Sequence, residues 1–395
     1  MLAARPVEQM PERYFLDARI FTDPKIFEEE IEGFFSRAWV FLGHECEAKG
    51  PGNYFLFEIG GRPVVVCRDS GSKIRGFIDA CRVCGGAVTG DRWGKREVFR
   101  CAQGHAAYDL SGRAVEGESR EGLAPIEVES IFGLIFGAVS PSEALREFLG
   151  KALVSWWEPI FSLDVEWELV NVFSFPTAVN WKAFMQPGDG YHVQGLHRIF
   201  AKHAQPKGAF YKFPSKFSPV SANYLFNYPP LDYERFRKDV WGKVKSREEA
   251  NIPPLVSVPQ ELGGYIGGIF PNSFYSIRND WVFAANAILP RAPERMVLDR
   301  RAYCRAGLSP EQKQIIQREE DIWSYPMGLN GQDDLANFEW QQKALRGGTI
   351  AKLLVARYPG EDPDALSSDI RGDSEAGYRT YFRRWQKYMG MKTAY

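Results

Sequence analysis

The sequence predicts an α+β protein in which a small all-β domain precedes a larger domain of antiparallel strands covered by helices. Three observations lead to this prediction. The chain has 395 residues, more than one ordinary core supports, which predicts two domains, or one large domain with a second inserted. Strand-like runs separated by Gly-rich turns fill residues 40–145. After Pro141 such runs alternate with segments of helical periodicity.

The composition excludes several classes of protein. Hydrophobic residues make up 45% and charged residues 25%, which are globular values and exclude disorder or a fibrous repeat. Lys and Arg number 49 against 50 Asp and Glu, so the basic excess of a nucleic-acid binder is missing. The longest apolar run, 131–139, is far shorter than the roughly 20 residues that span a bilayer. Residues 1–6 lack the apolar core of a signal peptide. We therefore expect a soluble, cytoplasmic protein without nucleic-acid or membrane partners.

The first part of the chain predicts one helix and then short strands. Asp23 as N-cap and Pro24 at the first helical position predict a helix over 23–39. Gly60-Gly61 predicts a two-residue hairpin turn. The expected strands are 54–59, 62–68, 74–78, 97–101 and 131–139.

The second part predicts a sheet with helices. Its expected helices are 141–153, 180–200, one opening at Ser309-Pro310, 335–346 and 374–390, and its expected strands are 163–173, 265–269, 274–277, 281–289 and 296–303, with loops over 205–260. These elements predict three regions. Residues 1–40 form a helical segment that packs on the C-terminal domain, 41–150 form the β domain, and 151–395 form the larger domain.

Two histidines and a later carboxylate suggest a metal site. His192 and His197 lie five residues apart, on roughly the same side of a helix or loosened helical turn, so both imidazoles can reach one ion. Asp334 lies in an acidic segment far along the chain. Two His and one carboxylate with open positions form the facial triad of non-haem Fe(II) oxygenases. Spacing alone leaves open that these are unrelated polar residues near a surface.

Motifs along nearly the whole chain carry a family resemblance. They are Asn180-Trp181-Lys182, then Asp189-x-x-His192-x4-His197, then Asp334 with Glu339 and Gln342, together with Trp39 to His44 and Ile269 to Asn272. By these motifs the chain resembles the α subunits of Rieske-type non-haem iron oxygenases, the ring hydroxylases and N- or O-demethylases. The resemblance implies a Rieske-like β domain and a catalytic domain with a sheet like that of star-related lipid-transfer proteins. It also implies mononuclear Fe(II) bound by His192, His197 and Asp334.

The cluster motif of that family is altered here. The family binds a [2Fe–2S] cluster through Cys-x-His and Cys-x-x-His, but Val83 and Gly104 occupy the two histidine positions. A Rieske cluster needs two His on one iron, so the standard cluster is not expected. Cys81, Cys84, Cys101 and His105 instead form Cys-x2-Cys-Gly and Cys-x3-His motifs. Four such ligands suit tetrahedral Zn²⁺. An unusually ligated [2Fe–2S] cluster ranks second, and an empty site third.

The resemblance also implies roles for Asp189 and for partners. In the family this acidic residue bridges a cluster-ligand His of one subunit to an iron-ligand His of the next, within a head-to-tail trimer. Here its cluster-side partner position is Gly104, so we expect Asp189 mainly to orient His192.

We expect an oxygenase component that uses O2 to hydroxylate or demethylate a small organic substrate, with aromatic compounds as the expected class. Its electrons would come from outside the altered domain: from a ferredoxin or reductase, or from a cluster-bearing α-like subunit of a mixed trimer. The alternative is a non-catalytic pseudo-α subunit that completes a mixed oligomer.

Overall fold

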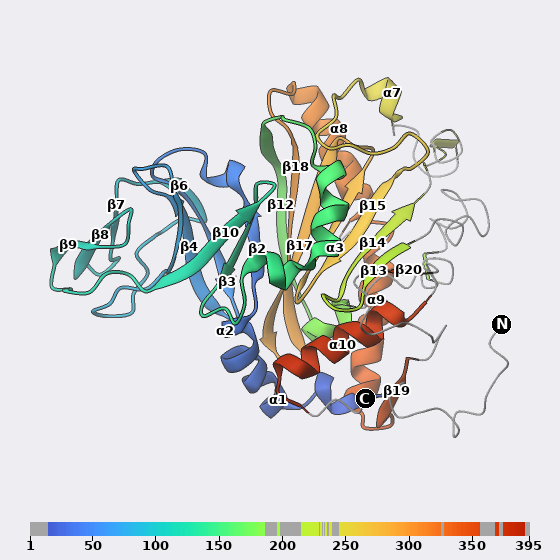
Figure 1. Cartoon of the computed structure of the whole chain (residues 1–395), viewed down its shortest axis with the longest axis horizontal. Coiled ribbons are helices and arrows are strands. Elements are labelled where there is room, and N and C mark those ends of the chain that lie inside the picture. The colour runs from blue at the N-terminus through green and yellow to red at the C-terminus, as the bar shows by residue number, and fades with distance from the viewer. Residues whose placement is uncertain are drawn as a thin grey trace. The chain divides into compact units, whose positions relative to one another are not determined.

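The computed structural model of the chain describes residues 15–185, 196–197, 215–228, 230, 232, 234, 237–238, 245–324, 328–355, 368–370 and 374–391. The described chain forms two compact units (Figure 1). One unit is Glu28–Phe148, and the other holds the chain up to Phe27 and from Leu149 onward. The mixed composition of helix and sheet, with a β unit followed by a helix-covered sheet, confirms the predicted fold class.

The Glu28–Phe148 unit is built on two antiparallel sheets. The larger has the order β2-β11-β10-β5-β4-β3-β6 and the smaller has the order β7-β8-β9. Their strands are β2 Val40–His44, β3 Asn53–Ile59, β4 Arg62–Arg68, β5 Ile74–Ile78, β6 Trp93–Lys95, β7 Val98–Arg100, β8 Ala106–Asp109, β9 Ala114–Gly117, β10 Pro125–Ile131 and β11 Leu134–Ala138. The hairpin predicted at Gly60-Gly61 joins β3 to β4, which confirms that prediction.

The strand predicted over 131–139 is confirmed over β11, but its first residues are wrong because they belong to a turn and to the end of β10. The structure has a hairpin there, in which β10 pairs with β11 through Ile131 and Leu134. The two turn residues, Phe132 and Gly133, have φ of 53° and 78°. Positive φ at both central positions fits a tight turn between twisted strands. The turn was not predicted from the apolar run because Phe is an unusual residue at positive φ.

The helix predicted over 23–39 is present with a local change of winding. It consists of α1 Pro24–Glu29, a π-helical turn over Glu30–Phe34 and α2 Phe35–Arg37. Asp23 accepts a hydrogen bond from the Lys25 backbone N–H through its side chain (2.9 Å), as expected of a residue that begins a helix.

The other unit is built around one antiparallel sheet of eight strands, in the order β12-β18-β17-β16-β15-β14-β13-β20. Its strands are β12 Trp167–Thr177, β13 Ser215–Ser218, β14 Asn223–Tyr228, β15 Gly264–Ile269, β16 Ser273–Arg278, β17 Val282–Ala292, β18 Arg295–Arg305 and β20 Ser368–Ile370. The prediction of loops throughout 205–260 is therefore wrong, since β13 and β14 lie within it. The two strands pair with each other as a hairpin, and each has a second partner farther along the chain, β20 for β13 and β15 for β14.

Helices cover both faces of this sheet. They are α3 Leu145–Ile160, α7 Arg247–Ala250, α8 Pro310–Trp323, α9 Gly331–Arg346 and α10 Ala376–Tyr388. Trp157 of α3 donates a hydrogen bond to the Tyr275 hydroxyl (2.8 Å) on one face. Ile316 of α8 packs with Val282 and Ala284 on the other. Alternation along β16 and β17 separates these two sets of side chains.

Shorter elements complete the second unit. The β1 strand Phe15–Asp17 pairs with β19 Lys352–Leu354. A 3-10 helix, Trp181–Met185, occupies the start of the helix predicted over 180–200, and the rest of that prediction lies outside the described residues apart from 196–197.

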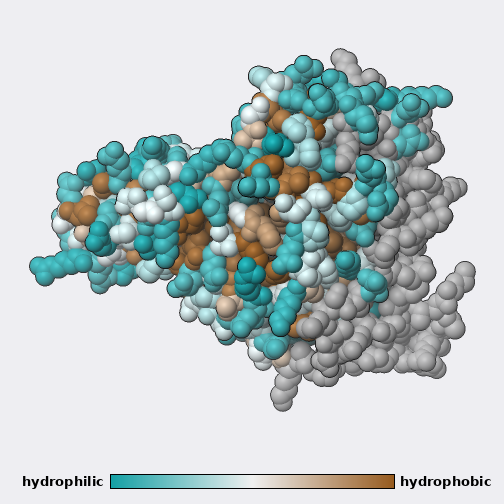
Figure 2. Space-filling model, turned by 45° about the horizontal axis from the view of Figure 1, so that its top comes forward, coloured by the Kyte–Doolittle hydropathy of each residue, from teal (hydrophilic) through white to brown (hydrophobic). Residues whose placement is uncertain are grey.

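The surface is predominantly hydrophilic on the face that Figure 2 presents, with hydrophobic patches among the charged and polar residues. No helix in the described part of the chain has the length and apolar character needed to cross a bilayer.

Candidate metal centres

The first centre lies where His197 meets the first turn of α9. His197 is 3% exposed. Its Nε2 lies 3.3 Å from Asp334 Oδ1, and its Nδ1 lies 3.4 Å from Asp333 Oδ2. The ring therefore has a carboxylate beside each nitrogen. His192 and Asp189 lie outside the described residues, so their predicted roles stay predictions.

Helix α9 is held in place by its buried Gln342. The Gln342 side chain accepts a hydrogen bond from the Asn180 backbone N–H (2.9 Å) and donates one to the Phe21 carbonyl (3.2 Å). One turn away, Glu339 accepts a hydrogen bond from the Thr177 hydroxyl (3.2 Å). These contacts hold the second half of α9 against the end of β12 and the residues that follow it, and the same helix carries Asp334 in its first turn.

Lys182 lies in the core close to the contacts between α9 and the end of β12. It is completely buried, and its ammonium lies 5.1 Å from the Trp181 ring, 5.4 Å from the Trp385 ring and 5.9 Å from the Phe21 ring. Aromatic faces attract a cation at such distances. The Asn180-Trp181-Lys182 motif thus supports the first centre by packing, with its side chains directed into the core.

The donors at this centre suit a divalent metal ion. His197 Nε2 and the neighbouring Asp334 Oδ1 are of the types that supply two of the three donors of the facial triad. The carboxylate of Asp333, at the other ring nitrogen, matches the way in which metal-binding histidines are commonly oriented. The described residues therefore fit mononuclear iron, with His192 as the predicted third ligand.

Sequence reasoning missed a buried ion-pair network between α8 and the sheet. Glu320 and Arg300 are 1% and 3% exposed, and the Arg300 guanidinium donates two hydrogen bonds to the Glu320 carboxylate. Arg300 also donates to Asn286 of β17 (3.1 Å). Burial raises the pKa of Glu320, but Arg300 and Arg278 outweigh it and the pKa is lowered overall. The only sequence signal was polar residues alternating within apolar strands.

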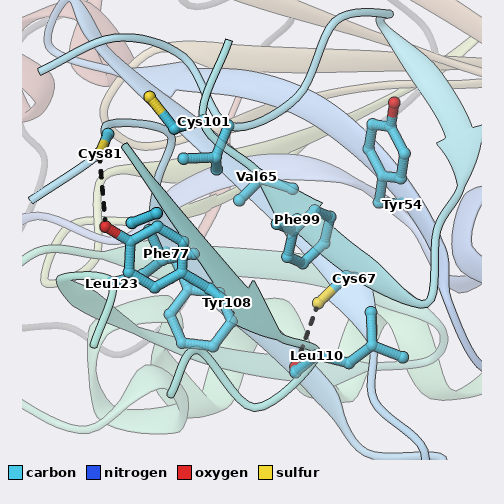
Figure 3. Packing of buried hydrophobic residues seen from close by; sticks show 12 residues of the cluster. Tyr54, Val65, Cys67, Phe77, Cys81, Phe99, Cys101, Tyr108, Leu110 and Leu123 are labelled. Atoms are coloured by element: carbon cyan, nitrogen blue, oxygen red, sulfur yellow. Dashed lines mark hydrogen bonds between the residues drawn. The ribbon is translucent and has the colours of Figure 1, made fainter. Parts of the chain in front are cut away.

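The second centre consists of three cysteines in the β unit. The sulfurs of Cys81, Cys84 and Cys101 all lie within 4.8 Å of one another. The Cys84 and Cys101 sulfurs are 3.4 Å apart. Figure 3 shows Cys81 and Cys101 at the same end of a buried hydrophobic cluster. In the part of the chain that the structure describes, no other group of three Cys, His or acidic residues gathers so closely.

Two backbone turns bring these sulfurs together. The Gly85 N–H donates to the Cys81 carbonyl (2.9 Å), and the Gly104 N–H donates to the Cys101 carbonyl (2.9 Å). Both glycines have positive φ, 72° and 79°, which favours glycine. The turns are joined by a hydrogen bond from the Ala102 N–H to the Ala87 carbonyl (2.9 Å).

Hydrogen-bond donors surround the sulfurs. The Tyr108 hydroxyl lies 3.5 Å from Cys81 Sγ, as the dashed line in Figure 3 marks. The Gln103 N–H donates to Cys101 Sγ (3.4 Å). Burial raises the pKa of Cys81, but hydrogen bonds from Tyr108 and from backbone N–H groups outweigh it and lower the pKa to about 6. At Cys84 the Gly86 N–H lowers the pKa, whereas burial and the two neighbouring sulfurs together raise it. Such surroundings suit thiolates that bind a metal ion.

His105, the fourth predicted ligand, does not join the three sulfurs. Its side chain is 37% exposed, and its Nδ1 lies 3.5 Å from Glu118 Oε2. Val83 and Gly104 stand where a Rieske cluster needs imidazoles. The described residues 81–105 therefore do not fit a standard Rieske cluster, whereas three thiolates fit a soft or borderline ion such as Zn²⁺.

Comparisons with known families cover both units. Residues 163–391 match the family model of the ring hydroxylating alpha subunit (catalytic domain). Residues 38–127 match that of the Rieske [2Fe-2S] domain.

Individual relatives span the whole chain or part of it. The chain is 24% identical over 395 residues to the 2-aminobenzenesulfonate 2,3-dioxygenase subunit alpha of Alcaligenes sp., covering 95% of this chain and 94% of the relative. It is 33% identical over 150 residues to the benzene 1,2-dioxygenase subunit alpha of Pseudomonas putida, covering 38% of this chain and 32% of the relative.

Solved structures share the fold. A naphthalene 1,2-dioxygenase from Rhodococcus sp. bound to indole is similar with a TM-score of 0.78 at 20% identity, covering 95% of this chain and 94% of that one. A quaternary ammonium Rieske monooxygenase is similar with a TM-score of 0.73 at 17% identity, covering 96% of this chain and 99% of that one.

Proposed function

Because the chain belongs to the ring-hydroxylating α subunits of the Rieske oxygenases, we propose that it is an oxygenase component that hydroxylates or demethylates a small organic substrate with O2. The observation that carries the proposal is the His197 imidazole held between Asp333 and Asp334 at the start of α9. The names of the relatives favour an aromatic substrate, among them benzene and 2-aminobenzenesulfonate.

Three residues would hold the iron. They are His192, His197 and Asp334, with Asp189 orienting the His192 ring from outside the ligand set. When bound, Fe(II) supplies a place for O2 to bind and be reduced beside the substrate. The chain's own contribution is to hold the donors before the metal arrives. Gln342 fixes α9, and the buried position of His197 restricts its ring to the side where Asp334 lies.

The altered cluster site would be structural. We propose Zn²⁺ on Cys81, Cys84 and Cys101, with His105 as fourth ligand after it leaves Glu118; a [2Fe–2S] cluster in unusual ligation ranks second. Support comes from the three gathered sulfurs and from Val83 and Gly104 at the histidine positions. A zinc site carries no electrons because zinc has no second accessible oxidation state.

The electron donor is then another protein chain. A ferredoxin or reductase is one class of donor. An α-like subunit with an intact Rieske cluster, in a mixed trimer with this chain, is the other. A non-catalytic pseudo-α subunit is the second candidate function, and the missing cluster imidazoles favour it.

Metal analysis separates these functions. We expect about one iron and one zinc per chain, measured by anomalous scattering at both absorption edges on one crystal. The protein should be nearly colourless and unchanged by dithionite. Iron should disappear in His192→Ala and Asp334→Ala while zinc and folding persist. Iron-free protein that cannot be reloaded with Fe(II) anaerobically would favour the pseudo-α subunit over the oxygenase. A red-brown colour with stoichiometric sulfide would show that the cysteine site holds an iron–sulfur cluster and not zinc.

A further inference from the structure

Two of the three gathered thiols are placed to react with each other. The Cys84 and Cys101 sulfurs are 3.4 Å apart, whereas a disulfide bond is about 2.05 Å long. Bond formation therefore needs the two atoms to approach by little more than an ångström. The hydrogen bond from the Ala102 N–H to the Ala87 carbonyl keeps the two turns side by side, so the close approach belongs to the backbone arrangement.

The surroundings select this pair among the three. Cys81 is 3% exposed, and its sulfur is engaged by the Tyr108 hydroxyl. Cys84 is exposed, so a dissolved oxidant can reach it. Cys101 is buried, which shields it from direct attack but leaves it beside Cys84. Cys84 is thus the thiol that reacts with the oxidant, and Cys101 is the thiol that then reacts with the oxidised Cys84.

Both turns have room to move. An added Cβ at Gly85 or at Gly104 would meet no atom within 4 Å. Gly85 directly follows Cys84 and Gly104 lies three residues after Cys101, so each turn has open space beside its glycine. The closing movement can occur in the turns while the strands that precede them stay paired.

We propose that Cys84 and Cys101 form a reversible disulfide in the metal-free protein, so that this site alternates between metal-bound thiolates and a disulfide. With hydrogen peroxide as oxidant, the Cys84 sulfur attacks one oxygen, the O–O bond breaks, and a sulfenic acid and water form. The Cys101 thiol then displaces the second water and completes the S–S bond. In sum, two thiols and one peroxide give one disulfide and two waters.

The reverse reaction and the competition with metal follow from the same atoms. A thiol reductant restores both cysteines by thiol–disulfide exchange, with its own oxidation to a disulfide. The oxidised site keeps only the Cys81 thiol of the original three, so it loses the ability to hold zinc. The competition with zinc rests on the proposed metal site, but the disulfide itself depends only on the metal-free protein.

The test counts thiols in the full-length chain. The protein has six cysteines, so metal-free reduced protein should lose two and keep four after one equivalent of hydrogen peroxide. Thiols are counted with Ellman's reagent under denaturing conditions, and peptide mapping should identify the Cys84–Cys101 link. Zinc-loaded protein should lose thiols at least tenfold more slowly and release zinc to a chromogenic chelator as it does so.

Two variants make the outcome decisive. Cys84→Ser changes an exposed residue and should abolish the intramolecular link. Cys46→Ser, at a partly exposed cysteine outside the site, should leave the loss of two thiols unchanged. Six thiols retained by metal-free wild type, a link to Cys81, or an undiminished loss of two thiols in Cys84→Ser would each overturn the proposal. If metal-free protein loses two thiols as expected but zinc-loaded protein loses them equally fast, the competition with zinc is overturned and the disulfide stands.

Discussion

At the scale of single side chains, Asp333 offers a test of the proposed iron site. Its carboxylate lies 3.4 Å from His197 Nδ1, on the opposite side of the ring from Asp334. A proton held on Nδ1 leaves Nε2 free to bind a metal. We expect Asp333→Ala to weaken Fe(II) binding by about 10- to 100-fold, and Asp333→Asn, which keeps an acceptor oxygen, to weaken it less.

Iron retained after anaerobic dialysis against buffered Fe(II) measures this effect, alongside the melting temperature. Glu311→Gln is the matched control, because Glu311 occupies the first turn of α8 as Asp333 does in α9. Equal iron affinity in wild type and Asp333→Ala would exclude a positioning role for Asp333.

His44 predicts a dependence of stability on pH. It is buried, its Nδ1 accepts a hydrogen bond from the Cys46 N–H (3.1 Å), and burial lowers its pKa to about 4. The unfolded chain binds a proton near the ordinary pKa of about 6.5. The stability that neutral His44 contributes is therefore complete above about pH 6.5 and is lost as the pH falls toward about 4. The full difference corresponds to about 3 kcal/mol.

Urea unfolding of the β unit between about pH 8 and about pH 5 measures this effect. We expect a loss of about 2 kcal/mol over that range in wild type. The same loss should be absent from His44→Asn, which keeps a side-chain acceptor for the Cys46 N–H. A parallel loss in both proteins would assign the pH dependence to other groups.

At the scale of elements, the Arg300–Glu320 pair joins β18 to α8. Removal of one partner leaves a buried charge uncompensated, which costs about 3–5 kcal/mol. We expect Glu320→Leu and Arg300→Met each to destabilise the protein by about that amount. The double variant should lose much less than the sum, because neither charge then remains.

A double-mutant cycle of unfolding free energies gives the coupling between the two residues. The exposed Lys245–Glu311 pair, with N and O 3.4 Å apart, is the control and should be coupled by less than about 1 kcal/mol. Additive losses at Arg300 and Glu320 would mean that the two side chains do not stabilise each other.

Several elements followed from the sequence because their signals are local. Paired glycines marked the β3–β4 turn, and Ser309-Pro310 marked the start of α8, where the Ser309 hydroxyl caps the helix. The strands β13 and β14 were missed. Their segment is rich in Pro and Tyr, and the hairpin that they form is completed by β20 on one side and β15 on the other. Pairing of that kind is decided by distant residues.

At the scale of the whole molecule, the family geometry predicts assembly. We expect a ring of three chains, closed by one heterologous contact repeated around a threefold axis. Light scattering coupled to size exclusion should give about 135 kDa for three copies of the 44.9 kDa chain. A mass near that of one chain at micromolar concentration would contradict the ring. Co-purification of a second, iron–sulfur-containing chain would favour the mixed trimer.

The sequence by itself determined the family, the order of the two domains and the candidate ligands. These depend on residue type and spacing, which the chain displays directly. Only the tertiary structure decided which candidates meet. It placed Asp333 beside His197, 136 residues away, and it paired His105 with Glu118 while three cysteines gathered without it. The direction of a side chain depends on the turn that carries it and on contacts with segments distant in the sequence. The spacing of a motif specifies neither of these.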